Sequence, residues 1–230
     1  MKPFSNLNEI LLDGYSFQYD MPGNGNQSVT ISTHQIGALV LTSGKLLAWD
    51  LFMIPDERYV FKKSLNPGRY PVDISVADFH PASHSRIACA RLYISEGQTV
   101  RWEVAAINNP DNESSEDIDN YGVDSGTGSF MDADAAQVLA PLVWEKQNGS
   151  DKFEGFCDKV IAEMEKHSLG HHSSASWANI RISESSEANV VTFSSGWGDG
   201  GYASFWGYDA TGKLTSLVTD FALFPTNDAA

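Results

Sequence analysis

The segment Tyr70-Pro-Val-Asp-Ile-Ser-Val76 decides the fold class of this 230-residue chain. Its apolar and polar residues alternate, which places Val72, Ile74 and Val76 on one face of an extended strand. Further strand patterns cover residues 28–33, 36–42, 45–50, 87–94, 99–107, 189–194, 202–208 and 214–221. The sequence therefore predicts an α+β fold made mainly of antiparallel β-sheet.

Turn residues between these segments predict how the strands follow one another. Ser43-Gly44 favours a hairpin between the strands on either side, and Ser95-Glu-Gly-Gln98 favours a tight turn between 87–94 and 99–107. The last three segments are expected to form a meander, because Asp199-Gly200 and Asp209-Ala-Thr-Gly212 are typical turn sequences.

Two helices are expected in a segment at about 132–169. The first covers residues 131–147, with Asp132 or Asp134 as its N-cap and Val138 among its apolar positions. The second covers 151–169 and has a continuous apolar stripe. The members of that stripe are Phe153, Phe156, Cys157, Val160, Ile161 and Met164.

A basic, turn-rich stretch at 62–68 suggests a boundary. Residues 1–61 are then an N-terminal β-rich lobe or sub-domain, and residues 69–226 are the main α+β domain. The sequence leaves open whether 1–61 fold separately or add strands to the main sheet.

The charge and the N-terminus limit the function classes. Thirty acidic residues against fifteen Lys and Arg give a net charge of −15, which argues against a nucleic-acid partner. The apolar runs are too short to span a membrane, and the first residues do not resemble a secretory signal. Cys89 and Cys157 are expected to be buried, reduced thiols. These features predict a cytoplasmic protein.

One polar segment, 108–120, contains five carboxylates and no Lys or Arg. It is either a solvated loop or an acidic patch that contacts a basic partner. The candidate partner-binding set consists of these five acids, two aromatic residues that are expected to be exposed, and one carboxylate close to them in the sequence. The members are Asp111, Glu113, Glu116, Asp117, Asp119, Trp197, Asp199 and Trp206.

Gly196-Trp-Gly-Asp-Gly-Gly201 formally matches a dinucleotide-binding fingerprint. That fingerprint must open a helix whose N-terminus faces the pyrophosphate, whereas Tyr202 begins a predicted strand. The segment is therefore interpreted as a glycine-rich turn.

A second cluster, 121–132, contains Asp124 and Asp132. These carboxylates are candidates for metal or acid–base chemistry, or for holding loop amides and capping the next helix. No nucleophile motif or zinc-binding histidine pattern is present. We therefore expect no catalytic residue, no metal and no cofactor.

Several of these segments together resemble a bacterial domain-of-unknown-function family numbered four-two-four-one, over about residues 70–224. The segments are 121–132, 177–180, 189–200, 206–209 and 219–221. The shared motif positions are Asp124, Thr127, Asp132, Trp177, Asn179, Trp197, Asp199 and Asp220. The resemblance supplies no catalytic residue. It implies a link to toxin neutralisation, because some members look like toxin immunity proteins.

Three function classes follow. The leading hypothesis is an immunity protein, not an enzyme, that occludes the active site of a basic cognate toxin, such as a nuclease effector of a type VI secretion system. The second is a metal-assisted hydrolase that uses Asp124, Asp132 and Asp199. The third is a carbohydrate or small-ligand binding module whose stacking surfaces are Trp177, Trp197, Tyr202 and Trp206.

Overall fold

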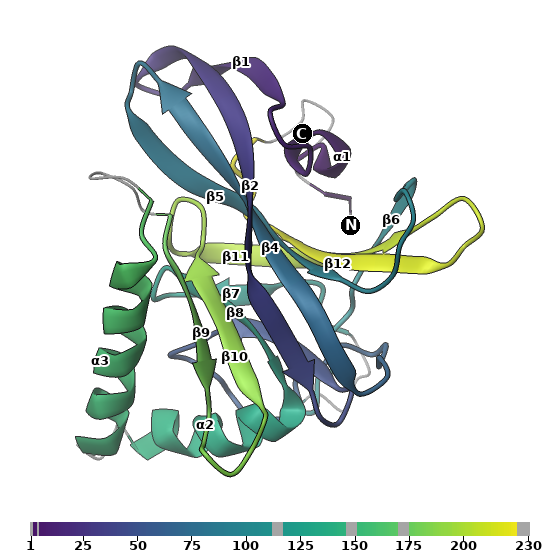
Figure 1. Ribbon diagram of the computed structural model, residues 1–230, viewed down its shortest axis with the longest axis vertical. Coiled ribbons are helices and arrows are strands. Elements are labelled where there is room, and N and C mark those ends of the chain that lie inside the picture. Colours follow the sequence, from purple (N-terminus) through teal and green to yellow (C-terminus); the bar gives the residue numbers. More distant parts are fainter. Residues whose placement is uncertain (1, 4, 112–116, 146–150, 170–174, 225–230) are drawn as a thin grey trace.

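The computed structural model describes residues 2, 3, 5–111, 117–145, 151–169 and 175–224 (Figure 1). These residues form two antiparallel sheets, two longer helices and one short helix. The predicted fold class, α+β with mainly antiparallel sheet, is confirmed.

The larger sheet has eight strands in the order β1-β2-β4-β5-β12-β11-β6, and β7 also pairs with β11. Their bounds are β1 Ser16–Met21, β2 Gly25–Leu41, β4 Gly68–His80, β5 His84–Tyr93, β6 Arg101–Val104, β7 Tyr121–Val123, β11 Gly200–Tyr208 and β12 Leu214–Asp220.

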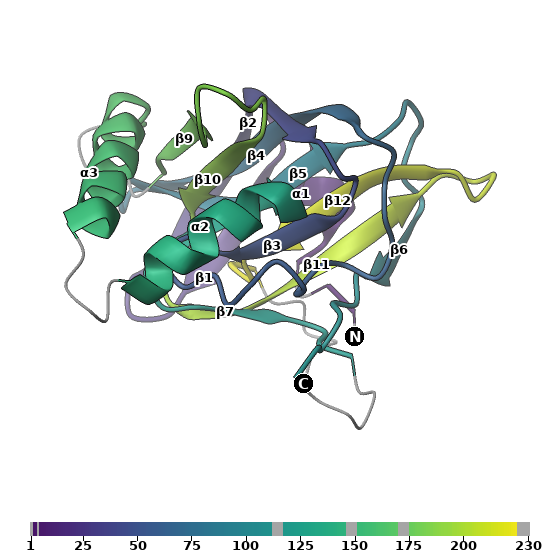
Figure 2. The ribbon, with the colours of Figure 1, turned by 90° about the horizontal axis from the view of Figure 1, so that it is seen from below.

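The smaller sheet has four strands in the order β3-β8-β10-β9, with bounds β3 Leu46–Asp50, β8 Thr127–Asp132, β9 Trp177–Arg181 and β10 Asn189–Ser194. The helices are α1 Leu7–Ile10, α2 Ala133–Glu145 and α3 Asp151–Lys166. Figure 2 shows α2 lying across the smaller sheet and α3 beside β9. None of the described helices has the length and apolar character needed to cross a membrane.

The main core lies between the two sheets. Val72, Ile74 and Val76 are fully buried there, as their alternation predicts, and they belong to the same cluster as Phe130 and Phe193 of the smaller sheet. The other faces of the sheets carry separate cores. One lies under α2 and α3, and the other lies under α1 and the segment after β12.

Two of the predicted strand connections are wrong. β3 pairs with β8 instead of β2, because the buried carboxylate of Asp132 at the end of β8 accepts the main-chain amides of Ser43 and Gly44. β6 pairs with β11 instead of β5, since β12 occupies the edge of β5.

The predicted meander is correct for two of its three strands. β11 and β12 form the expected hairpin, in which the Asp209 carboxylate accepts the amides of Thr211 and Lys213. β10 belongs to the other sheet.

Both helices are present, and Asp132 caps α2 by accepting the Asp134 amide at 2.9 Å. Val138 and Ile161 are 51% and 50% exposed, so their expected places on the apolar faces are wrong. The sheet covers only a narrow strip of α2, where small residues such as Ala136 and Ala140 fit closely. Neither cysteine forms a disulfide. Cys89 is buried in β5, where desolvation raises its pKa to about 12, and Cys157 on α3 is half-buried.

Residues 1–61 contribute strands to both sheets. β1 and β2 belong to the larger sheet and β3 to the smaller one. Strand pairing crosses the predicted boundary at 62–68, because β2 pairs with β4 from Ser28–His80 to Leu41–Gly68.

The two sheets are joined where β2 passes β9 and β10. The buried side chain of Asn189 accepts the Val40 amide at 2.7 Å and donates to the Ala38 carbonyl at 2.8 Å and to Asn179 Oδ1 at 2.6 Å. β2 is irregular at this point, with φ of +121° at Gly37. A Cβ atom on Gly37 would lie 2.5 Å from Asn179 Nδ2, so this joint requires glycine.

Gly37→Ala is expected to destabilise the fold more than Gly23→Ala. Both positions have positive φ, which costs an alanine about 1–2 kcal/mol. Only at Gly37 would the new Cβ atom also collide with another side chain, that of Asn179. Chemical denaturation should give a difference of about 1–3 kcal/mol between the variants. Equal losses would show that Asn179 moves aside freely.

Candidate functional site

Asp132, a motif residue and a candidate metal ligand, is fully buried and serves the fold. Its carboxylate accepts hydrogen bonds from the amides of Ser43, Gly44 and Asp134 and from the hydroxyls of Thr42 and Ser43. A carboxylate that takes this many donors is satisfied without a cation. Asp132 therefore joins β8 and α2 to the turn between β2 and β3.

Asp50, which the sequence analysis did not single out, holds the glycine-rich loop between β7 and β8. It is fully buried and accepts the amides of Phe52, Asp124 and Ser125, each at 2.8 Å. The loop-holding role considered for Asp124 thus belongs to Asp50, and the Asp124 side chain is exposed. The sequence feature that could have identified Asp50 is its position at the end of a predicted strand.

Asp220, the last residue of β12, is buried in a similar way. It accepts the Ser5 amide at 2.8 Å, the Ser5 hydroxyl at 2.9 Å and the Ala222 amide at 2.9 Å. Thr127, another motif residue, is also buried. These motif positions therefore support the architecture of the chain.

The three aspartates of the hydrolase hypothesis are not gathered into one cluster. Asp124 and Asp199 are exposed in neighbouring turns, where Val123 pairs with Gly200, while Asp132 is buried at the start of α2. Within the described ranges, no group of three or more His, Cys, Asp or Glu residues is placed to hold a metal ion.

The ends of the acidic segment are paired with nearby residues. Asp111 accepts from Arg58 at 3.2 Å and from the Tyr59 hydroxyl at 2.6 Å, and Asp117 accepts from Lys62 at 2.8 Å. The hydrogen bond to Asp111, together with burial, raises the pKa of Tyr59 to about 12. Asp119 is half-buried, and the predicted contacts Glu113 and Glu116 lie outside the described residues.

Most of the candidate aromatic residues are covered. Trp206 is 3% exposed and packs against Phe61 between the sheets, so the expectation that it is an exposed anchor is wrong. Tyr202 is also buried, and Trp177 is half-buried and stacks with His34 and His167. The stacking surface proposed for a sugar is therefore reduced to Trp197.

Trp197 is 45% exposed and is the centre of a group that we call the Trp197 cluster, made of Phe79, His84, Arg86 and Trp197. The Arg86 guanidinium lies 5.2 Å from the indole centroid, and the rings of Phe79 and His84 lie 5.8 Å from it. Arg86 makes no ion pair with any described residue.

Two buried nitrogen atoms of this cluster, His84 Nδ1 and Arg86 Nε, lack hydrogen-bond partners among the described residues. Burial and the nearby Arg86 charge lower the pKa of His84, and burial lowers the pKa of Arg86. The cluster thus presents an aromatic ring and an unneutralised cation at the surface.

A sequence model of the family described as "Protein of unknown function (DUF4241)" matches residues 39–219. The chain belongs to this family. The DUF4241 match begins well before the resemblance expected from residue 70, at the end of β2, and so includes β3 of the smaller sheet. No curated protein and no solved structure matches the chain.

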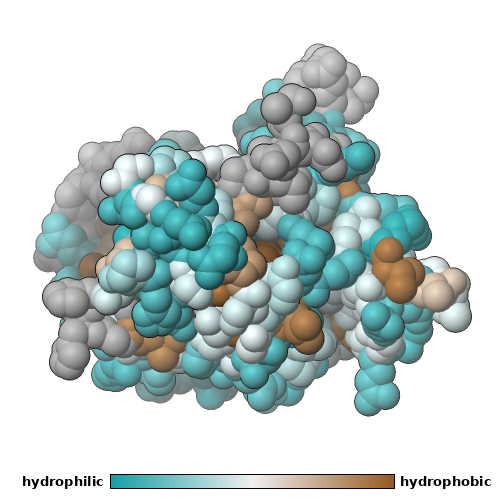
Figure 3. All heavy atoms as spheres, turned by 90° about the horizontal axis from the view of Figure 1, so that it is seen from above, coloured by the Kyte–Doolittle hydropathy of each residue, from teal (hydrophilic) through white to brown (hydrophobic). Residues whose placement is uncertain are grey.

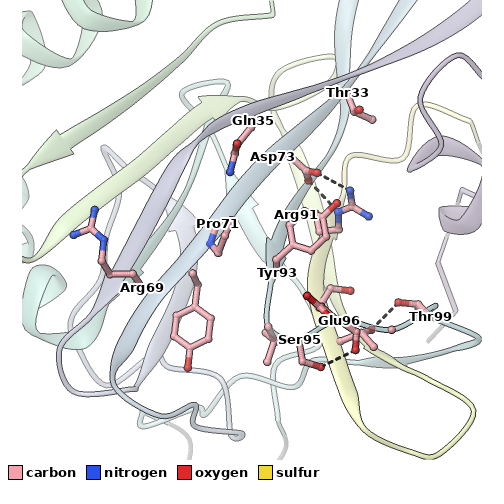
Figure 4. Close-up of a pocket in the computed structure, with 15 residues that line it drawn as sticks. Thr33, Gln35, Arg69, Pro71, Asp73, Arg91, Tyr93, Ser95, Glu96 and Thr99 are labelled. Atoms are coloured by element: carbon pink, nitrogen blue, oxygen red, sulfur yellow. Dashed lines mark hydrogen bonds and ion pairs between the residues drawn. The ribbon is translucent and has the colours of Figure 1, made fainter.

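A cleft of about 710 Å³ on the larger sheet was not foreseen from the DUF4241 sequence (Figure 4). Asp73 and Arg91 form a two-bond ion pair in it, with N–O distances of 3.0 and 2.5 Å. The Arg91 guanidinium lies 4.0 Å from the Tyr93 ring centroid. The volume of the cleft is in the range of small-ligand sites.

Asp132→Ala is expected to destabilise the protein by about 3 kcal/mol, because it leaves buried amides without an acceptor. Asp134→Ala is the matched control. That carboxylate is exposed and accepts from Thr42, so its loss should cost about 1 kcal/mol or less. Urea unfolding measures both values. A small loss for Asp132→Ala would contradict the structural role.

His84→Gln should weaken the pH dependence of stability. The pKa of His84 is lower in the folded chain than in the unfolded chain, so the unfolded state binds more protons as the pH falls below about 6.5. The free energy of unfolding of the native protein therefore decreases as the pH falls. Unfolding free energies at about pH 7.5 and 5.5 should differ less in the variant. Equal differences would exclude His84 as the cause.

Proposed function

We propose that this protein is a cytoplasmic immunity protein, not an enzyme, that binds and neutralises a cognate bacterial toxin. The toxin is a basic nuclease effector delivered by a contact-dependent or type VI secretion system. Neutralisation occurs by occlusion, with acidic side chains of the immunity protein lying where the phosphates of the substrate would lie.

The observation that carries this proposal is the Trp197 cluster. Binding hot spots are rich in Trp and Arg, and their aromatic rings lie half-exposed until a partner covers them. Trp197 and Arg86 combine both residue types at one point, and the Arg86 charge is not neutralised by any described acid. A toxin segment that covers the indole and offers one acidic side chain fits this point.

The overall charge of the protein supports recognition of a basic partner. In the view of Figure 3 the surface is mostly hydrophilic, and apolar residues lie in separate small patches. With a net charge of −15, the protein attracts a basic partner over long range and speeds association. Asp199 is exposed two residues from Trp197 and adds an acid beside the anchor.

The structural roles of the buried carboxylates also favour a binding protein over an enzyme. Asp50, Asp132 and Asp220 are occupied by main-chain amides, and Asp73 is occupied by Arg91. These groups hold loops and strands in place and are not gathered around a shared substrate.

Trp197→Ala should weaken the complex with the toxin encoded by the neighbouring gene by about 2 kcal/mol, or about 30-fold in Kd. Trp144→Ala is the control, because Trp144 is also an exposed tryptophan, at 56%, and lies on α2. Calorimetry measures Kd, and co-expression measures protection of growth. Thermal unfolding of both variants checks that they remain folded.

The outcomes separate the function from the location of the interface. If the unaltered protein neither rescues growth nor co-purifies with the toxin, the immunity function is rejected. If it does both and Trp197→Ala binds as tightly as Trp144→Ala, the function stands and the Trp197 cluster is not the interface.

A further inference from the structure

The cleft on the larger sheet contains an aromatic platform that is fixed from below. Asp73, only 7% exposed, holds the Arg91 guanidinium through two hydrogen bonds, and Arg91 stacks on one face of the Tyr93 ring. Tyr93 itself is 38% exposed. Because Arg91 is neutralised by Asp73, the platform offers a flat ring and no net charge.

Two arginines that form no ion pair with a described acid lie at or next to one end of this cleft. Of the six arginines, Arg58, Arg91 and Arg101 form ion pairs. Two of the other three, Arg69 and Arg181, line a neighbouring pocket of about 230 Å³ and pair with no described acid. Arg69 lines both cavities, so the small pocket adjoins the cleft at this residue. Arg181 Nε donates to the Ser186 carbonyl at 2.6 Å, but no described acid neutralises either guanidinium group, and two such charges around one small pocket favour an anion.

The rest of the small pocket is polar. It is lined by the amide side chains of Asn179 and Asn189, and Glu187 is the one acidic residue in its lining. Asn189 donates its amide hydrogens to Ala38 and Asn179, so the donors left for an oxyanion with several oxygens are the two guanidinium groups and one N–H of Asn179. A phosphate group fits this donor set.

The spacing of the two features is set by strand geometry. Arg69 is two residues before Pro71 on β4, and two residues span about 7 Å along a strand. Tyr93 follows Leu92, the partner of Val72, so it lies across from Pro71 on the adjacent strand. Figure 4 shows Arg69 beyond Pro71, away from the Asp73–Arg91 pair and Tyr93. This arrangement suits a molecule with a flat ring at one end and an anionic group at the other.

Hydroxyl and amide groups line the space between and beside these ends. Ser216 Oγ is buried, lines the cleft and has no hydrogen-bond partner in the described part of the chain. Gln35 and Thr33 lie along the β2 side of the cleft (Figure 4). The Gln35 amide and the Thr33 hydroxyl can hydrogen-bond sugar hydroxyls.

We propose that this cleft binds a nucleoside monophosphate, with the base stacked on Tyr93 and the phosphate held by Arg69 and Arg181. This site is separate from the Trp197 cluster, so the proposal goes beyond toxin neutralisation. A single nucleotide needs only one local anion site, and it is therefore compatible with a chain whose overall charge disfavours nucleic acids.

The test is calorimetric titration of the full chain with AMP, GMP, CMP and UMP, and with adenosine, ribose 5-phosphate and inorganic phosphate. At least one monophosphate is expected to bind, and the three partial probes should each bind about tenfold more weakly or worse, since each lacks one part. The affinity should also fall with added salt, because the phosphate contact is electrostatic.

Variants locate the site. Arg69→Ala should weaken the monophosphate about tenfold or more and leave adenosine unchanged, while Tyr93→Ala should weaken both. Arg58→Ala removes an arginine from another surface and should change neither. Three results would overturn the proposal: no monophosphate bound at millimolar concentration, inorganic phosphate bound as tightly as the nucleotide, or nucleotide affinity unchanged by Arg69→Ala. None of these results bears on whether the protein neutralises a toxin.

Discussion

The relative position of the two sheets depends on one buried amide. Asn189, at the start of β10, hydrogen-bonds the main chain of β2 at Ala38 and Val40, just after the irregularity of β2, and contacts Asn179 on β9. An unpaired amide in this environment would be costly, so the hydrogen bonds fix where β2 meets the smaller sheet. The core between the sheets and the pocket that contains Arg181 both follow from that position.

The chain uses its excess of acid in two ways. Buried aspartates gather main-chain amides and hydroxyls, and so give irregular connections the acceptors that β-pairing does not supply. The remaining carboxylates lie near the surface and produce the long-range electrostatic field of the protein. Against that field, the three arginines that form no ion pair with a described acid are notable. Arg86 beside Trp197 and the pair Arg69 and Arg181 mark two different surfaces.

The sequence predicted those features that depend on neighbours along the chain. Alternation located Val72, Ile74 and Val76 in the core, and Asp209 marked the turn between β11 and β12. The partner of β3 was not predictable, because it depends on a carboxylate almost ninety residues away that captures the Ser43–Gly44 turn. Trp197 and Trp206 were both expected to be exposed. The sequence places Trp197 in a turn and Trp206 in a strand, but it does not show that this strand lies between β12 and β6 or that Trp206 belongs to the core between the sheets. For the same reason the cleft, which combines β2, β4, β5 and β12, had no local signature.

The two cysteines differ in a way that has a practical use. Reagents such as maleimides attack the thiolate, and Cys89 is enclosed in β5 with a pKa of about 12. Cys157 lies half-buried on α3. A dye added to the native protein near neutral pH is therefore directed to a single helix, and it provides a fluorescent label without any engineered residue.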